Sequence, residues 1–237
     1  MPLDSHNKTA LVTGGNRGIG FAICQGLLKA GFNVFMGSRS LEKGKAAAAK
    51  LDPSGSNIQV LELDVADDQS IQQAFNRLSQ QCDRLDVLVN NAGIYPDSEV
   101  DILTISRDLL MQTLDVNTFS MIRTVQAFLP LLKKAESARV INYSSGYGQL
   151  AGLSANVPSY CLSKLAVNGA TIMLADALRS RDIVVNAVDP GWVETDMGGA
   201  SAPRTPEQGA DTAIWLATKA SLSESGKLWH DRQVVPY

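Results

Sequence analysis

Thr13-Gly14-Gly15-Asn16-Arg17-Gly18-Ile19-Gly20 is the segment from which the architecture of this chain can be worked out. It follows an apolar run at residues 10–12, which predicts a strand, and precedes a run at residues 21–28, which predicts a helix. A strand, a glycine turn and a helix N-terminus make an anion site, because free backbone N–H groups and the positive end of the helix dipole point at one place. The spacing G-x-x-x-G-x-G differs from the common G-x-G-x-x-G, and a plain glycine-rich turn is the alternative.

The length and composition of the chain indicate one globular domain over residues 1–237. Hydrophobic residues make up 45% and charged residues 19%, as in ordinary soluble proteins. The net charge of -3 does not favour a nucleic-acid partner. The N-terminus has no apolar signal core, and no run is expected to be long and apolar enough to span a membrane, so we expect a cytoplasmic protein. Three scattered cysteines and two histidines near the termini predict neither a metal site nor a histidine-based nucleophile triad.

Strand-like and helix-like segments alternate along the chain. Further strands are predicted at residues 32–37, 58–63, 86–89, 140–143 and 184–188, and helices at residues 41–51, 70–79, 102–132 and 158–179. This alternation predicts an α/β fold: a single doubly wound, Rossmann-like domain whose parallel sheet is covered by helices on both faces. A Gly-, Ala-, Ser- and Pro-rich loop is expected at residues 198–206.

Ligands in such sheets bind outside the carboxyl ends of the strands, so the residues that follow each strand are candidates for ligand contacts. An NAD site usually places Asp or Glu about 20 residues after the glycines, but no acid occurs between Gly20 and Leu41. Arg39 stands there instead, next to Ser38, and Arg17 lies in the glycine segment. Two guanidiniums would bind a 2′-phosphate by charge-assisted bonds, which favours NADP over NAD. The alternative is that both arginines are solvated surface residues.

The next two strand ends carry small polar motifs. Asp64-Val65 follows the third strand, where Asp64 either accepts from an adenine amino group or caps the following helix. Asn90-Asn91-Ala92-Gly93 follows the fourth strand and either lies against a ribose or forms a tight turn. The sequence leaves both pairs of interpretations open.

A candidate reacting group follows the fifth strand. Ser145 lies at its end, and Tyr160 and Lys164 are one turn apart in a helix opened by Pro158. A nearby ammonium favours tyrosinate, so we expect Lys164 to lower the pKa of Tyr160 from about 10 and make it a general acid or base. Ser145 would hold a carbonyl oxygen beside the phenol. The alternatives are a core aromatic for Tyr160 and a solvated position for Lys164.

Together these motifs resemble the short-chain dehydrogenase/reductase family. The matches come in the family's order and span nearly the whole chain: Thr13-Gly14-x-x-x-Gly18-Ile19-Gly20, Asp64-Val65, Asn90-Asn91-Ala92-Gly93, Asn117, Ser145, Tyr160-x-x-x-Lys164 and Pro190-Gly191-x-x-x-Thr195. The resemblance is closest to the NADPH-dependent carbonyl reductases, through the glycine segment, Ser38-Arg39 and Pro190-Gly191-Trp192-Val193-Glu194-Thr195-Asp196-Met197.

The resemblance implies hydride transfer from NADP(H) to a small ketone or aldehyde. Tyr160 would protonate the carbonyl oxygen, Ser145 would position that oxygen, and Lys164 would also hold the nicotinamide ribose. Asn117 would hold a water that links Lys164 to solvent. These four residues form the implied catalytic set.

The resemblance also implies a set of cofactor-binding residues, among which Val193 and Thr195 would bind the nicotinamide carboxamide. The full set is Gly14, Asn16, Arg17, Gly18, Ile19, Gly20, Ser38, Arg39, Asp64, Val65, Asn91, Ala92, Gly93, Tyr160, Lys164, Pro190, Gly191, Val193 and Thr195.

One departure bears on assembly and on the substrate. Animal and plant carbonyl reductases often carry a long insertion between the catalytic serine and tyrosine, whereas Ser145 to Tyr160 is short here. In that branch the insertion covers helices used elsewhere for subunit packing, so a homodimer or homotetramer is expected. A 3-oxoacyl thioester reductase shares the same catalytic residues and is the alternative enzyme. A non-catalytic NADP-binding sensor is the other alternative, although it has no need of the tyrosine proton.

Overall fold

The strands lie side by side in one sheet. In the computed structural model, which describes residues 7–237, the strands are β1 (Thr9–Val12), β2 (Asn33–Ser38), β3 (Ile58–Glu62), β4 (Val87–Asn90), β5 (Arg139–Tyr143), β6 (Val184–Val188), β7 (Leu228–His230) and β8 (Gln233–Val235). Their order is β3-β2-β1-β4-β5-β6-β7-β8. The chain therefore winds outward from β1 to β3 and returns to the other side of β1 with β4. Such a reversal creates a crevice at the carboxyl ends of the strands, where α/β proteins bind ligands.

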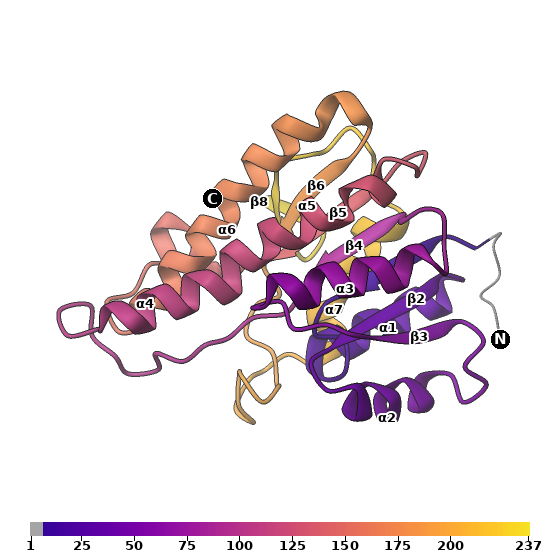
Figure 1. The fold of residues 1–237 in the computed structure, drawn as a ribbon. Helices are drawn as coiled ribbons and strands as arrows, with labels where there is room; N and C mark the ends of the chain where they lie inside the picture. The colour runs from indigo at the N-terminus through magenta and orange to yellow at the C-terminus, as the bar shows by residue number, and fades with distance from the viewer. Residues whose placement is uncertain (1–6) are drawn as a thin grey trace.

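Helices cover both faces of this sheet (Figure 1). One face carries α1 (Gly18–Lys29), α2 (Leu41–Leu51) and α7 (Pro206–Thr218), and the other carries α3 (Asp68–Ser79), α5 (Ser120–Leu132) and α6 (Pro158–Leu178). Successive strand side chains point to opposite faces, so Ala10 and Val12 join the α1–α7 core and Leu11 joins the α3–α5 core. The predicted doubly wound α/β fold is confirmed, except that β8 pairs antiparallel with β7.

The long helix predicted at residues 102–132 starts later than expected. It begins with α4 (Arg107–Leu114), whose N-cap Ser106 accepts a hydrogen bond from the Leu109 N–H at 3.2 Å. It continues through the π-helical turn η1 (Asp115–Phe119) into α5. Residues 102–106 belong instead to the loop that follows β4, because their own turn is held by Asp101, whose carboxylate accepts the Leu103 N–H at 2.8 Å.

The C-terminal elements α7, β7 and β8 are absent from the sequence-based prediction. The predicted loop at residues 198–206 ends at Thr205, which caps α7 in a capping box with Gln208. That box is a readable signal that the prediction missed. β7 and β8 are only three residues each, too short to show a hydrophobic period, and they form because they pair with β6 and with each other.

Helix α6 corrects the expectation that no run is long and apolar enough to span a membrane. By length and composition alone, Pro158–Arg181 passes that test, with a mean hydropathy of 1.3. Half of it is buried inside the protein, and it carries the buried polar residues Lys164 and Asn168. We therefore describe α6 as a core helix packed on the sheet.

Candidate active site

The glycine segment forms a tight loop between β1 and α1. Gly14 and Gly18 have φ angles of +64° and +52°, in the region that favours glycine. A Cβ on Gly20 would lie 2.3 Å from the carbonyl oxygen of Gly14, so the start of α1 packs directly on the loop backbone. The N-cap residue Arg17 makes no side-chain cap, and the first turn of α1 holds no acidic residue. The positive end of the helix is therefore open toward the crevice.

The motif after β4 holds this loop in place. The Asn91 side-chain amide donates to the carbonyl oxygens of Thr13 at 2.9 Å and Gly14 at 3.2 Å. The Thr13 hydroxyl accepts the N–H groups of Asn91 and Ala92, both at 3.0 Å. The motif thus ties the end of β4 to the end of β1 and helps to fix the shape of the glycine loop, while a contact of Asn91 with the cofactor stays a prediction.

Lys164, Asn117 and Gly93 meet at the carboxyl ends of β4 and β5. Lys164 is buried and donates from Nζ to the Tyr143 carbonyl oxygen at 2.8 Å, so it is not the solvated residue of the alternative interpretation. The Asn117 side chain accepts the Ile94 N–H at 2.8 Å and donates to Ser163 Oγ at 3.0 Å. A Cβ on Gly93 would lie 3.1 Å from Asn117 Oδ1 and 3.7 Å from Lys164 Nζ. Asn117 comes from the π-helical turn η1, a feature often found at functional sites.

Tyr160 and Ser145 are brought together across the crevice. Their hydroxyl groups lie close enough to interact, because the Ser145 side chain acts to lower the pKa of the Tyr160 phenol. Lys164 Nζ lies 5.5 Å from the centre of the Tyr160 ring. The rings of Tyr95 and Tyr147 pack edge-on against the Tyr160 ring, at centroid distances of 4.7 Å and 6.3 Å. Tyr160 is partly buried among these groups and is not a core aromatic.

The pKa of Tyr160 differs from the sequence-based expectation. Burial raises the pKa of Tyr160 above its ordinary value of 10, and the nearby Ser145 hydroxyl only partly opposes this. The negative charge of Asp189 raises it further. The predicted lowering by Lys164 is wrong because the ammonium is directed at the Tyr143 carbonyl oxygen, and because burial disfavours the charged phenolate. Tyr160 is therefore held in its protonated form.

The loop after β6 closes over the glycine segment. Thr195 approaches Gly18, where a Cβ would lie 3.1 Å from the Thr195 methyl group. Asp196 forms an ion pair with Arg17. Val193 is buried and forms a β-bridge with Arg204, and Gly191 has a φ of +71°. The predicted residues of this loop thus meet those of the glycine segment.

The predicted residues after β2 and β3 lie farther along the same edge. Arg39 is exposed and, within residues 7–237, has no ion-pair partner. The Ser38 hydroxyl donates to the Ser40 carbonyl oxygen at 2.9 Å. Asp64 does not cap the following helix, because Asp67 caps α3; the Asp64 carboxylate accepts the Ala66 N–H at 3.1 Å. That alternative for Asp64 is wrong, and its adenine contact stays a prediction.

Two residues of this region were missed by the sequence analysis. Asp189 directly follows β6, and its Oδ2 would lie 3.4 Å from a Cβ on Gly146, next to Ser145. His230, set aside as terminal, lies with Nδ1 3.0 Å from the Asp189 carbonyl oxygen. Asp189 was readable as a charged residue at a strand end. His230 was not, because its place depends on the pairing of β7 with β6.

Comparison with known proteins fits this geometry. Residues 8–205 match the sequence model of the family described as short chain dehydrogenase. The chain belongs to the short-chain dehydrogenase family. Among its relatives, carbonyl reductase (NADPH) 1 of Sus scrofa is 32% identical over an alignment of 283 positions, gaps included, which covers 99% of this chain and 96% of the pig protein.

Two further members of the family show how wide the likeness is. The 3-oxoacyl-(acyl-carrier-protein) reductase FabG of Aquifex aeolicus is 31% identical over 250 residues, covering 97% of this chain and 98% of the relative. The crystal structure of NADPH-bound carbonyl reductase from chicken fatty liver superposes with a TM-score of 0.89 at 29% identity. That superposition covers 98% of this chain and 99% of the chicken chain.

The burial of Lys164 predicts a specific pH dependence of stability. Burial lowers the pKa of Lys164 from 10.5 to about 8. Below pH 8 Lys164 is protonated in both the folded and the unfolded chain, so the folded protein bears the full free-energy cost of burying the ammonium charge. Between pH 8 and 10.5 the unfolded chain binds more protons, so the stability of the folded protein rises with pH. Relative to Lys164→Met, the unfolding free energy of the wild type should increase by about 1–2 kcal/mol from pH 7.5 to 9.5.

Urea unfolding of both proteins at the two pH values measures this difference. Other titrating groups are common to both proteins and cancel in the comparison. Equal pH dependence of the two unfolding free energies would show that Lys164 titrates normally.

Proposed function

We propose that this chain is an NADPH-dependent reductase that converts a ketone or aldehyde to an alcohol, with residues 1–237 as one catalytic domain. The proposal rests chiefly on the contact between the Ser145 and Tyr160 hydroxyl groups, with buried Lys164 beside them. A carbonyl oxygen placed between these hydroxyls would accept a proton from one and a hydrogen bond from the other. General acid catalysis requires this geometry.

The glycine loop fits the pyrophosphate of a nicotinamide dinucleotide. Helices α2, α3, α4 and α7 each have an N-terminus capped by a side chain, namely Ser40, Asp67, Ser106 and Thr205. The N-terminus of α1 has no such cap, and the close packing of Gly14 and Gly20 allows a ligand to approach its N–H groups. The names of the pig and chicken relatives state NADPH, which supports the same cofactor here.

The adenosine end of the crevice favours NADPH over NADH. Arg39 extends into solvent after β2 with no partner among residues 7–237, and so is available to a 2′-phosphate. Arg17 is already paired with Asp196, so it would have to leave that carboxylate to bind the same phosphate. We therefore assign the larger share of phosphate binding to Arg39.

In the proposed reaction each polar residue has one task. Bound NADPH would supply the hydride to the carbonyl carbon. Tyr160, kept protonated by burial, would donate its proton to the carbonyl oxygen, while Ser145 holds that oxygen. Lys164 would hold the nicotinamide ribose. Asn117 fixes the Gly93–Ile94 backbone and Ser163 through its side chain, and we propose that it also supports proton supply to Lys164.

A 3-oxoacyl thioester reductase is a second candidate, favoured by the 31% identity to the Aquifex reductase. A panel of diketones, aldehydes, quinones and 3-oxoacyl thioesters, followed by NADPH absorbance, separates the two. Preference for the thioesters would support the second candidate. Binding of NADPH without turnover of any carbonyl would support the non-catalytic sensor.

Tyr160→Phe should abolish most of the carbonyl reduction. The ring contacts with Tyr95 and Tyr147 remain, but the proton donor is lost, so kcat should fall by about 10²–10⁴-fold. The NADPH dissociation constant should change by less than about twofold, because the hydroxyl alone is removed. Tyr147→Phe is the matched control and should keep its rate. A Tyr160→Phe variant that retains most of the wild-type kcat would show that another group donates the proton.

Arg39→Ala should reduce the preference for NADPH. A charge-assisted hydrogen bond contributes about 1.5–3 kcal/mol, so the NADPH dissociation constant should rise by roughly tenfold to a hundredfold. NADH carries a hydroxyl in place of the 2′-phosphate, and its dissociation constant should barely change. Fluorescence titration with both cofactors, at low and high salt, measures this.

The control for Arg39→Ala is Lys50→Ala, which removes one positive charge from the far end of α2. Lys50→Ala should leave both dissociation constants near the wild-type values. Equal weakening of NADH and NADPH in Arg39→Ala would indicate that Arg39 supports the fold or the adenine instead of the phosphate.

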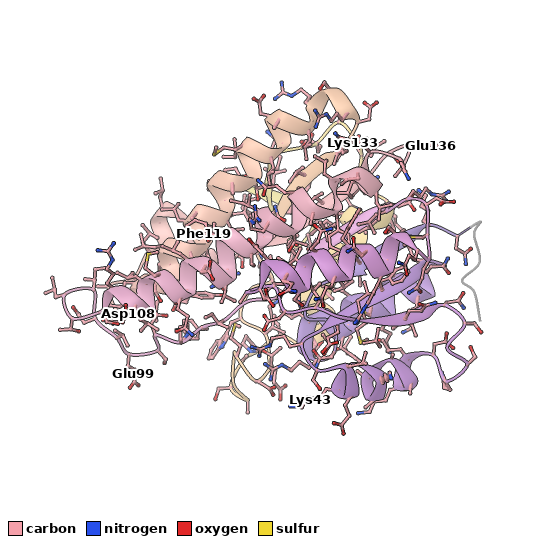
Figure 2. All side chains as sticks on the ribbon, viewed as in Figure 1. Lys43, Glu99, Asp108, Phe119, Lys133 and Glu136 are labelled. Carbon is pink, nitrogen blue, oxygen red and sulfur yellow. The ribbon has the colours of Figure 1, made fainter. Side chains whose placement is uncertain are left out.

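We also propose a homodimer or homotetramer formed through the outer surfaces of α4, η1 and α6. Large apolar side chains are exposed there: Met111, Phe119, Leu162, Ile172 and Met173. Figure 2 labels Phe119, which lies at the end of η1 between α4 and α5. Exposed apolar groups clustered on adjoining helices favour an isologous contact.

Light scattering should therefore give a dimer or tetramer mass, and Met173→Glu should shift it toward the monomer. The matched control is Leu222→Glu, which places the same charge on an exposed leucine outside these helices. A wild-type monomer at all concentrations would contradict the assembly.

A further inference from the structure

Helix α6, which carries Tyr160, begins without a cap of its own. The N-cap position is Val157, which has no polar side-chain atom, and Pro158 at the next position has no N–H. Val157, Pro158 and Ser159 are all buried. The N–H groups of Ser159 and Tyr160 therefore lie where water does not reach them, and an unpaired buried donor is destabilising.

Asp97 supplies the missing acceptor from the loop after β4. Its Oδ2 accepts the Ser159 N–H at 2.6 Å and the Tyr160 N–H at 3.2 Å. Asp97 has no solvent exposure, and the other Asp97 oxygen has no hydrogen-bond partner within residues 7–237. A carboxylate in such a place is stabilised by the two N–H groups and by the positive end of α6.

Two of the three buried charged residues in the described part of the chain lie against Tyr160. Among residues 7–237 the buried acidic and basic residues are Asp86, Asp97 and Lys164. Asp86 accepts the Thr9 N–H at 2.7 Å and pairs with Arg84, so these two contacts explain why an acidic residue is buried there. The other two lie on either side of Tyr160: Asp97 at its backbone N–H and Lys164 below its ring.

The loop that carries Asp97 also contacts the Tyr160 ring. Tyr95, two residues earlier, packs edge-on against that ring at a centroid distance of 4.7 Å. The Ser159 hydroxyl donates to Thr113 Oγ1 at 2.9 Å, which joins the same turn of α6 to α4. The backbone and the ring of Tyr160 are therefore both held by groups from outside α6.

We propose that Asp97 is a positioning residue of the reaction, resting on the proposed function of Tyr160 as the proton donor. By accepting the Tyr160 N–H it fixes where α6 begins and hence where the Tyr160 hydroxyl meets Ser145. Without this acceptor the first turn of α6 unwinds or shifts, and the hydroxyl moves away from the carbonyl oxygen. A displacement of about 1 Å at a reacting group costs up to 10²-fold in rate.

The test compares Asp97→Leu, which fills the same space without an acceptor, with Asp97→Asn, which keeps a neutral acceptor. Glu99→Gln is the matched control: it removes one negative charge from an exposed position of the same loop (Figure 2). The folded fraction of each variant is counted by NADPH titration, and kcat is expressed per folded enzyme.

Asp97→Leu should lower kcat by about 10–100-fold, while the KM for the carbonyl and the dissociation constant of NADPH stay within about threefold. Asp97→Asn should recover to within about fivefold of the wild type, and Glu99→Gln should be unchanged. A folded Asp97→Leu variant with the wild-type kcat overturns the proposal. An Asp97→Asn variant as slow as Asp97→Leu overturns it as well, because the acceptor would then not be what matters.

Amide hydrogen exchange tests the same contact without any assay of turnover. The Ser159 and Tyr160 amides should be protected in the wild type and should lose that protection selectively in Asp97→Leu. If Asp97→Leu does not fold, the amide exchange rates of the wild type test the proposal. Exchange at the Ser159 and Tyr160 amides that is as fast as in exposed loops would overturn it. If the wild type reduces no carbonyl, the proposed function fails, but the exchange rates still show whether Asp97 holds Tyr160.

Discussion

The backbone contact between Gly20 and Gly14 constrains the rest of this structure. It leaves no space for a side chain, since a Cβ on Gly20 would also lie 2.6 Å from the side-chain nitrogen of Asn91. As a result the start of α1 sits directly above the end of β1, and the end of β4 is tied to both through Asn91. The crevice at the strand reversal, with its open helix N-terminus, follows from that packing.

The reacting end of the crevice depends on polar groups that are kept from water. Lys164 and Asp97 are buried, and each is hydrogen-bonded to backbone groups: the ammonium to the Tyr143 carbonyl oxygen, and one carboxylate oxygen to two α6 N–H groups. Burial also raises the pKa of Tyr160, which suits the proton-donor role that we propose for it. Without water these groups are costly to bury. For the same reason their hydrogen bonds to the protein are strong, and these bonds fix the positions of the side chains.

Much of the fold was predictable because its signals are local. The helix at residues 41–51 and the strand at residues 184–188 occur with the predicted bounds, since an alanine-rich run favours a helix and a valine-rich run favours a strand. The failures came where local signals were weak or were overridden. Residues 102–106 stayed in a loop, and the three-residue strands β7 and β8 exist only through pairing with strands formed elsewhere in the chain.

The sequence by itself determined the strand–helix alternation, the glycine loop and the identity of the polar residues at the strand ends, because these depend on spacing along the chain. It also placed Tyr160 and Lys164 one helical turn apart. Only the tertiary structure decided that Arg17 is paired with Asp196 while Arg39 has no ion-pair partner among residues 7–237, and that Asp97 caps the helix of Tyr160. It also decided the direction of the Tyr160 pKa. Hydration and the distances between remote segments govern these properties, and both are set by packing, which no local pattern records.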